Sequence, residues 1–349
     1  MSRGIKNIGL YLLLVALSGL FLTGCVARSK GIEVVKDDEE DKILIGFSFD
    51  TFIMERWERD RDVFVSKANE LGVEVNIQSA NGEVAEQRKQ IEYFIETGCD
   101  VIVIVPVDSD LLSDEVQRAK EMGIKVVAYD RMIIGGDVDL YITFDNRKVG
   151  EFMAEAIYEG VGEGANVVRV NGPLTDANVT VVNEGFDEIA DKYGFTLVDE
   201  INCTGWDQDT AYQYVIDNID MIKEADAIVC GNDALASKVI QGLSEHRLAG
   251  NIIVTGQDAE LESCQHIVEG TQTMTVYKPI NELAETAATY IVDLANEETL
   301  PYTGEIFDGI YYVPYVAIKP YSVNKDNIDR LIIDTGFHQK EEVYLNLNN

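Results

Sequence analysis

Short apolar runs alternate with longer amphipathic stretches along the first part of the chain. The apolar runs cover residues 42–49, 73–80, 101–106 and 125–130, and the amphipathic stretches cover residues 56–71, 83–97 and 110–122. Apolar runs are typical of strands that are covered on both faces, and the stretches between them have the length and periodicity of helices. The strands start about every 24 to 30 residues, which is the length of a βαβ unit. The pattern therefore predicts a parallel sheet with right-handed crossovers.

A second series of the same kind begins after Asn146, which marks a candidate boundary between two lobes. Its predicted strands are residues 166–172, 195–202, 227–233, 252–258 and 273–279, and a helix near residues 280–296 leads into a less regular end. The two series resemble each other in pattern, although no sequence repeat is evident. The expected fold class is α/β, with two lobes of similar size.

Polar side chains gather where the predicted strands end. In an open α/β sheet, ligands bind outside the carboxyl ends of the strands, so these side chains are candidates for a binding site. Those that follow the strands are Asp50, Arg56 with Trp57, Asp130, Arg131, Asp145, Asn146, Asn171, Asn232, Asp233, Gln257, Asp258 and Lys278. Asp and Asn at such positions also cap the helix that follows, so no single one of them identifies a site.

The composition of this set favours a sugar as the ligand. It holds carboxylates, carboxamides and cations, and it includes Trp57; the other tryptophan of the chain is Trp206, in the second lobe. Sugar hydroxyls both donate and accept hydrogen bonds, and the C–H groups of the ring form an apolar face that an aromatic ring covers. The two tryptophans could therefore enclose a sugar between the lobes, although each alone is equally well a packing residue. The glycines of residues 160–166 lack the spacing of a phosphate-binding loop.

The N-terminus has the layout of a bacterial lipoprotein signal. Two cations precede an apolar run over residues 8–22, and the sequence LTGC then ends at Cys25. The run is short for a membrane span, and the small residues before Cys25 match a lipobox, in which the cysteine is acylated and residues 1–24 are removed. An uncleaved anchor helix is the alternative. Either way, an acidic tether up to residue 41 is expected to hold the remaining chain outside the cytoplasm, attached to a membrane.

Composition narrows the possible functions. The chain has 349 residues, of which 46% are apolar, and 62 acidic residues against 28 basic ones give a formal net charge of -34. That charge repels nucleic-acid phosphates and anionic lipid surfaces, so no nucleic-acid partner is expected. Isolated histidines and cysteines without metal-ligand spacing predict neither a metal site nor a cofactor. Buried free thiols rather than disulfides are expected at Cys99, Cys203, Cys230 and Cys264.

Several stretches at the candidate positions resemble the periplasmic sugar-binding proteins of ABC transporters, and within them the D-xylose-binding branch. The resemblance covers roughly residues 42–340. Its most specific stretches are MERWERDRDVF (54–64), QSANG (78–82), VVAYDRMI (126–133), DLYITFDNRKVG (139–150), GNDA (231–234), TGQDAEL (255–261) and GTQTMTVYKP (270–279). The ERW and TMTVYKP sequences together are similar to the xylose branch in particular. Residues 171–180 and 203–212 match the family only loosely.

The resemblance implies a fold and a set of sugar-binding residues. The fold is two Rossmann-like lobes with parallel sheets and the ligand in the cleft between them, closing by a hinge motion. Three crossovers are expected near Asn146, Tyr277 and Phe307. The lobes would be residues 42–146 with 277–307 and residues 147–276 with 308–337, followed by a tail of residues 338–349. The residues expected to bind the sugar are Arg56, Trp57, Asp130, Arg131, Asn146, Trp206, Asn232, Asp258 and Lys278.

The function that the resemblance implies is a lipid-anchored extracytoplasmic receptor that captures D-xylose or a related monosaccharide and delivers it to an ABC permease. The same module could instead dock on a membrane histidine kinase as a sensor, and the sequence does not separate these two partners. An enzyme that uses Asp130 and Asp258 as a catalytic pair is disfavoured, because Arg131 would hold the adjacent Asp130 ionised as an acceptor. The signal peptide and the acidic charge disfavour a DNA-binding repressor of the same fold.

Overall fold

The computed structural model describes residues 42–347, which belong to one compact unit. The expected signal peptide, the acylated Cys25 and the acidic tether lie outside the described residues. Within the described part of the chain, no helix is both long enough and apolar enough to span a membrane.

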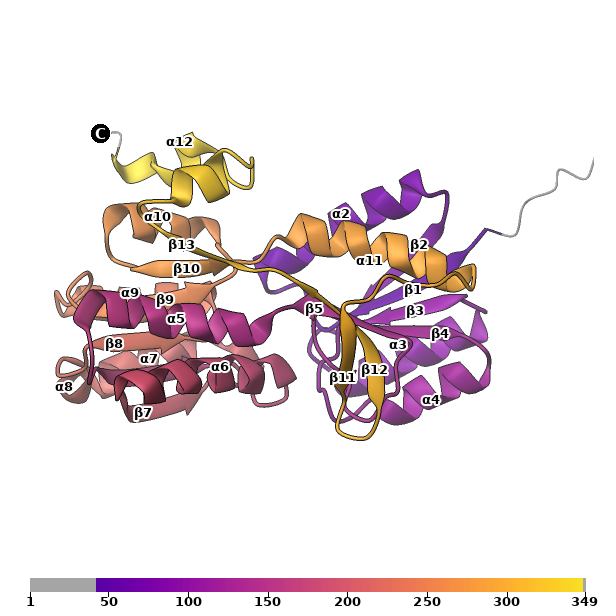
Figure 1. The fold of residues 1–349 in the computed structure, drawn as a ribbon, viewed down its shortest axis with the longest axis horizontal. Coiled ribbons are helices and arrows are strands. Elements are labelled where there is room, and N and C mark those ends of the chain that lie inside the picture. Colours follow the sequence, from indigo (N-terminus) through magenta and orange to yellow (C-terminus); the bar gives the residue numbers. More distant parts are fainter. Residues whose placement is uncertain (1–41, 348–349) are drawn as a thin grey trace, which may run out of the picture. The chain divides into compact units, whose positions relative to one another are not determined.

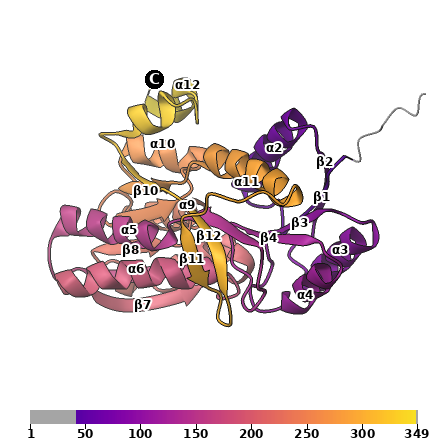
Figure 2. The same ribbon diagram turned by 45° about the vertical axis from the view of Figure 1, so that its right-hand side comes forward.

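The first lobe is built on a seven-stranded sheet in the order β11-β12-β5-β4-β3-β1-β2 (Figure 1). Its strands are β1 (Leu44–Phe49), β2 (Glu74–Ser79), β3 (Val101–Ile104), β4 (Lys125–Tyr129), β5 (Leu140–Phe144), β11 (Gly304–Phe307) and β12 (Tyr312–Ile318). All neighbours are parallel except β11, which pairs antiparallel with β12 at the edge. One face packs against α2 (Glu55–Glu70) and α11 (Ile280–Ala295), and the other against α3 (Val84–Glu96) and α4 (Ser113–Glu121) (Figure 2).

The second lobe is built on a six-stranded sheet in the order β13-β10-β9-β8-β6-β7. Its strands are β6 (Asn166–Asn171), β7 (Thr196–Asn202), β8 (Ala227–Cys230), β9 (Ile253–Gln257), β10 (Met274–Tyr277) and the antiparallel β13 (Tyr321–Asn324). Its helices are α5 (Asn146–Val161) with α6 (Ala177–Tyr193) on one face, α7 (Gln208–Asp217), α8 (Ile219–Ile222) and α9 (Asp233–Glu245) on the other, and α10 (Leu261–Glu269) beside β10.

The apolar runs of the sequence follow from the burial of both sheets on both faces. Every residue of β3 and of β8 is buried, as expected for strands between two helical layers. The prediction of an α/β fold with two lobes, each built on a mostly parallel sheet, is therefore confirmed. The cysteines fit the same core, because Cys99, Cys203 and Cys230 are buried free thiols and Cys264 is buried as well.

The chain passes between the sheets at three places, and one of them differs from the expectation. It crosses from β5 to α5, from β10 to α11, and from β12 to β13 at Lys319 and Pro320. The expected crossover near Phe307 is wrong, because β12 returns to pair with β5 in the first sheet. Asp308 accepts hydrogen bonds from the backbone N–H groups of Ile310 and Tyr311, and Gly309 takes a φ of 102°, so this segment makes a hairpin turn.

The C-terminal residues are part of the second lobe and not the tail that the sequence led us to expect. Helix α12 (Lys340–Val343) packs against α10, with Val343 buried between them and a hydrogen bond from Gln265 Nε2 to the carbonyl of Glu342. The one-turn segments η2 (Asp329–Ile333) and η3 (Leu345–Leu347) lie on either side of α12 in the chain. Lys340 and Tyr344 both bind the carboxylate of Asp329, which fixes α12 on the lobe.

Helices α5 and α6 cross at two glycines, and a methyl group there is expected to destabilise the fold. A Cβ at Gly150 would lie 1.9 Å from the carbonyl oxygen of Val182, and one at Gly185 would lie 2.0 Å from that of Arg147. Because both obstacles are backbone, we expect Gly150→Ala to lower the free energy of unfolding by about 3 kcal/mol. Denaturant unfolding measures this. The control is Gly304→Ala, where nothing lies within 4 Å of the added Cβ; equal stability of the two variants would contradict the prediction.

Candidate functional site

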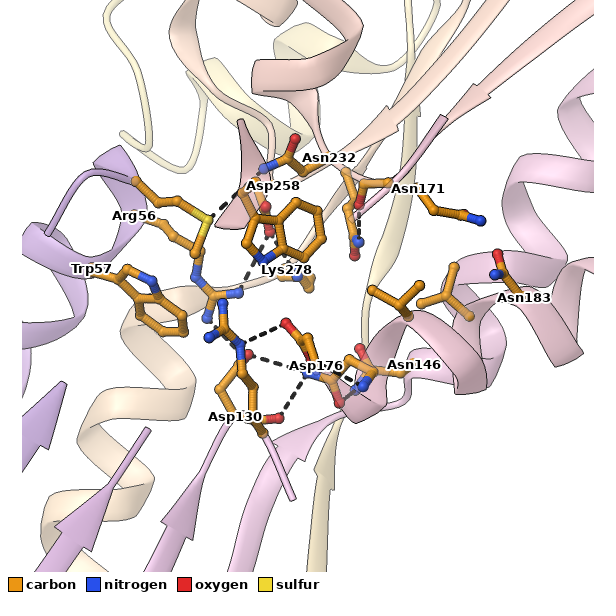
Figure 3. Close-up of a pocket in the computed structure, with 18 of the residues that line it drawn as sticks. Arg56, Trp57, Asp130, Asn146, Asn171, Asp176, Asn183, Asn232, Asp258 and Lys278 are labelled. Atoms are coloured by element: carbon orange, nitrogen blue, oxygen red, sulfur yellow. Dashed lines mark hydrogen bonds and ion pairs between the residues drawn. The ribbon is translucent and has the colours of Figure 1, made fainter. Parts of the chain in front are cut away.

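The carboxyl ends of the strands of both sheets face one pocket between the lobes (Figure 3). All nine residues expected to bind a sugar line it. Arg56 and Trp57 come from the first turn of α2, while Asp130 and Arg131 follow β4. Second-lobe residues close the other side, namely Asn146 at the start of α5, Trp206 in η1 (Thr204–Trp206), Asn232 at the start of α9, Asp258 after β9 and Lys278 after β10.

Three of the pocket residues have a left-handed backbone conformation, which L-residues other than glycine rarely adopt. The φ angles are 62° at Asp130, 101° at Asp258 and 59° at Trp206. Such a conformation costs on the order of 1–3 kcal/mol per residue and persists only where the surrounding structure holds it. Because this conformation occurs at three places around one pocket, we infer that it serves to direct these three side chains into the pocket, at a cost in local stability.

A buried network of ion pairs joins the lobes across the pocket. Nη2 of Arg56 lies 2.8 Å from Oδ2 of Asp130, and Nη1 of Arg56 lies 3.5 Å from Oδ1 of Asp258. Nζ of Lys278 lies 2.7 Å from the same Asp258 oxygen, and Nε of Arg56 lies 3.4 Å from Asp60 beneath the pocket. Arg56 thus holds carboxylates of both lobes, and every charged group of this network is buried and paired.

Arg131 makes a second connection between the lobes. Its Nη1 donates a hydrogen bond of 2.5 Å to Asp50 of the first lobe, and its Nε lies 2.6 Å from Oδ2 of Asp176 of the second lobe. Burial raises the pKa of both carboxyl groups, and the positive charge of Arg131 opposes that rise. Removal of Arg131 would therefore leave two buried carboxyl groups without a counterion.

Asp130 is held as a carboxylate. Burial by itself raises its pKa, but the cations of Arg56, Lys278 and Arg131 together outweigh burial, and the pKa lies below its usual value. Its two oxygens accept from Arg56 Nη2 and, at 3.3 Å, from Asn178 Nδ2. An ionised carboxylate of this kind accepts hydrogen bonds but donates none. The group is therefore suited to binding hydroxyl groups and unsuited to general-acid catalysis.

The two tryptophans lie in different surroundings. Trp57 is 1% exposed, and the guanidinium carbon of Arg56 lies 4.2 Å from the centre of its ring. Trp206 lies against the backbone of Gly172 and Gly231, where an added Cβ would approach the indole to 2.3 Å and 3.3 Å. The absence of side chains at these glycines is what lets Trp206 lie flat against the end of the second sheet.

Comparison with known proteins identifies the architecture. The model of the periplasmic binding protein domain matches residues 45–299, which is more than half of the chain. The chain belongs to the periplasmic binding protein family. It is 40% identical over 307 residues to the D-xylose-binding periplasmic protein of Haemophilus influenzae, covering 86% of this chain and 92% of that protein. It is 39% identical over 344 residues to the protein of the same name from Escherichia coli K12, covering 97% and 99%.

Solved structures agree with this assignment. An ABC transporter solute-binding protein from Clostridium phytofermentans with bound β-D-glucose superposes with a TM-score of 0.78 at 27% identity, covering 86% of this chain and 99% of that one. The expectation that the chain binds a solute and is not an enzyme is confirmed by membership of a family of solute-binding proteins.

The pocket of this periplasmic binding protein also contains residues that the sequence did not single out. Asn178 donates from Nδ2 to the carbonyl of Asp130, at 3.0 Å, and accepts at Oδ1 from Asn146 Nδ2, at 2.9 Å. It lies in the first turn of α6, where strand ends give no signal. The other lining residues outside the expected set are Met54, Asn171, Asp176, Val179, Val182, Asn183, Val229, Gly231 and Gln257. Among these, Asn171 and Gln257 stand at strand ends and were visible as such in the sequence.

Asp233 supports the pocket from below. Its carboxylate accepts hydrogen bonds from Gln272 Nε2 at 3.0 Å, from Thr275 Oγ1 at 2.7 Å and from the backbone N–H of Glu260 at 3.1 Å. The last bond fixes the strained turn that carries Asp258. Burial raises the pKa of Asp233 to about 7, although the bonds from Thr275 and Gln272 lower it.

The raised pKa predicts a pH-dependent contribution of Asp233 to stability. In the folded chain the group keeps its proton up to pH about 7, whereas its ordinary pKa is 3.8. The stability that it contributes is therefore complete below pH 3.8 and is lost as the pH rises through 7. Between pH 5 and pH 8 we expect the wild type to lose about 2 kcal/mol relative to Asp233→Asn. Denaturant unfolding at both pH values measures the difference, with Asp191→Asn as an exposed control; a difference that stays constant with pH would contradict the prediction.

Proposed function

We propose that this chain is a receptor for D-xylose or a closely related monosaccharide. The observation that carries the proposal is the composition of the pocket, in which buried carboxylates, carboxamides, cations and both tryptophans of the chain converge from two lobes. A neutral polyhydroxylated ring satisfies such a set, because each hydroxyl can accept from a cation and donate to a carboxylate. Two relatives named D-xylose-binding periplasmic proteins, at 39% and 40% identity, support xylose in particular.

Each group of residues has a distinct part in this binding. Asp130 and Asp258 accept hydrogen bonds from hydroxyl groups, and Arg56, Arg131 and Lys278 donate to sugar oxygens. The carboxamides of Asn146 and Asn232 can do both. Trp57 and Trp206 cover the C–H faces of the ring, and this contact excludes water from the polar bonds around its edge.

Ligand entry requires the lobes to separate. The space left among the pocket side chains is about 30 Å³, which is less than a sugar ring fills. The pairs between Arg56 and Asp258 and between Arg131 and Asp176 span the lobes, so they must part when the cleft opens. A sugar that contacts both lobes then stabilises the closed state, and the free energy of those contacts sets the population of that state.

The proposal extends to location and partner. Acylation at Cys25 would hold the receptor at the outer surface of the membrane, and delivery to an ABC permease would follow from closure. A structural neighbour that is named as an ABC transporter solute-binding protein supports a permease rather than a sensor kinase as the partner. Metabolic labelling with a fatty acid tests the anchor, because Cys25→Ala should lose both the label and the membrane association.

The test of the ligand is isothermal titration of residues 26–349, which include the whole compact unit, against xylose, ribose, glucose and galactose. We expect one-to-one binding that is tightest for xylose, together with a rise of the thermal midpoint that follows from binding to the folded state alone. Tighter binding of a hexose would correct the ligand, and binding of none of the four sugars would refute the proposal.

A further inference from the structure

A second cavity adjoins the sugar pocket between the lobes. The two cavities share four lining residues, Met54, Arg131, Trp206 and Asn232. The second cavity has a volume of about 280 Å³, against about 30 Å³ for the sugar pocket. Its volume is close to the lower end, about 300 Å³, of the range found for small-molecule sites. The sugar pocket is thus the smaller part of the ligand space in this cleft.

The positions of the strand ends explain why the second cavity exists. The sugar pocket takes residues that follow strands of both sheets, among them Arg56 in the helix after β1, Asp130 after β4 and Asp258 after β9. The second cavity takes other residues that follow β1, β2, β3 and β7, namely Asp50, Gly82, Asp108 and Thr204, and it shares Arg131 after β4 and Asn232 after β8 with the sugar pocket. The carboxyl ends of both sheets therefore line a continuous space, and one monosaccharide covers only part of it.

The lining of the second cavity shares part of the chemistry of the first, namely an aromatic face beside buried and polar groups. Trp206 is common to both, and the carboxylate of Asp50 is 4% exposed and accepts from the backbone N–H of Thr51. Hydroxyl and carboxamide groups come from Thr175, Thr204 and Gln208. Because Asp50 is paired with Arg131, this lining offers acceptors, hydroxyl groups and an aromatic face without a large net charge, which suits a neutral polyhydroxylated ligand.

The side chains of Met54 and Asn232 line both cavities, and a ligand that extends from one cavity into the other would pass between them. Nδ2 of Asn232 meets Sδ of Met54 at 3.9 Å between them. A methionine side chain has three rotatable bonds and adapts readily to a new neighbour. The indole N–H of Trp206 is shielded from solvent and has no hydrogen-bond partner among residues 42–347, so it is a donor available to a ligand at this point.

From these features we infer that the second cavity binds a second neutral pyranose unit, joined by a glycosidic bond to the sugar in the pocket. The receptor would then take a xylose disaccharide as well as xylose. This inference rests on the proposed function, because the first unit occupies the pocket described above. Trp206 would contact both units, and Asp50 and the hydroxyl groups opposite would bind the second unit alone.

The test compares xylose with xylobiose by isothermal titration of residues 26–349. Val84→Trp fills the second cavity from the first turn of α3 without touching the sugar pocket. Val161→Trp, at the exposed C-terminal end of α5 and outside both cavities, is the matched control. We expect xylobiose to bind within about ten-fold of xylose, and Val84→Trp to weaken xylobiose at least 30-fold while xylose changes less than three-fold.

Three results would overturn the inference. Binding of xylose without binding of xylobiose would show that the second cavity is an entry path only and would leave the proposed function intact. Equal weakening of both sugars by Val84→Trp would show that the cavity serves closure and not a second sugar unit. Absence of binding by either sugar would refute the proposed function itself, and the inference with it.

Discussion

Replacement of Asp130 by asparagine is expected to weaken binding of the sugar about 100-fold. Both oxygens of Asp130 face donors, since Oδ2 accepts from Arg56 and Oδ1 from Asn178. Whichever way the asparagine amide turns, its NH₂ group meets a donor. The variant also removes one of the carboxylates that face Arg56, so Asp258 and Asp60 alone remain to balance that buried cation and Lys278.

Titration calorimetry with xylose measures the effect, and thermal unfolding without sugar shows whether the variant is folded. Asp220→Asn, whose carboxylate is fully solvated on α8, is the control and should bind as the wild type does. An Asp130→Asn variant with a normal midpoint and an unchanged dissociation constant would exclude Asp130 from the binding site.

Replacement of Trp206 by alanine is expected to weaken sugar binding at least ten-fold. The change removes an aromatic face from the pocket, worth about 2 kcal/mol in buried apolar area and ring contact together. It also leaves a hollow over Gly172 and Gly231 that water can enter. Because Trp206 is only partly buried and packs against the margin of the second-lobe core, we expect its loss to change stability less than affinity.

A graded series distinguishes the ring contact from general disruption. Trp206→Phe keeps an aromatic face of smaller area and should lie between the wild type and the alanine variant in affinity. Gly172→Ala leaves the tryptophan in place but directs a methyl group at its ring, 2.3 Å from Cη2, so the ring must tilt. Unchanged affinity in all three variants would remove Trp206 from the binding site.

The pattern of apolar runs was sufficient to predict the two lobes, because strands buried on both faces leave an unambiguous signal. It was not sufficient for the end of the chain. Exposed and buried positions are interspersed along β11 and β12, with Phe307 at 52% and Tyr312 at 70% exposed, so this hairpin lacks the continuous buried run of the central strands. The Asp308-Gly309 sequence was the available sign of a turn at this point. Because the chain turns back there into β12 of the first sheet, it crosses to the second sheet only after β12, at Lys319.

The site was predictable to the extent that it lies at strand ends. All nine expected residues line the pocket, since parallel strands bring their carboxyl ends to one edge. Asn178 and Asp176 follow β6 by a loop and a helical turn, and their contacts with Asp130 and Arg131 depend on how the lobes meet. That geometry arises between distant segments, and residue spacing along the chain does not encode it.

The return of β12 to the first sheet has a consequence for how the chain acquires its fold. Strand β5 is buried along its whole length, and β12 covers one of its edges through pairs such as Tyr315 with Tyr141. During synthesis from the N-terminus, this apolar edge stays open until almost the entire chain has been made. Open apolar edges recruit other strands, and contacts between such distant segments form slowly. A ribosome that stops before β12 would therefore release a self-associating intermediate and not a smaller stable lobe.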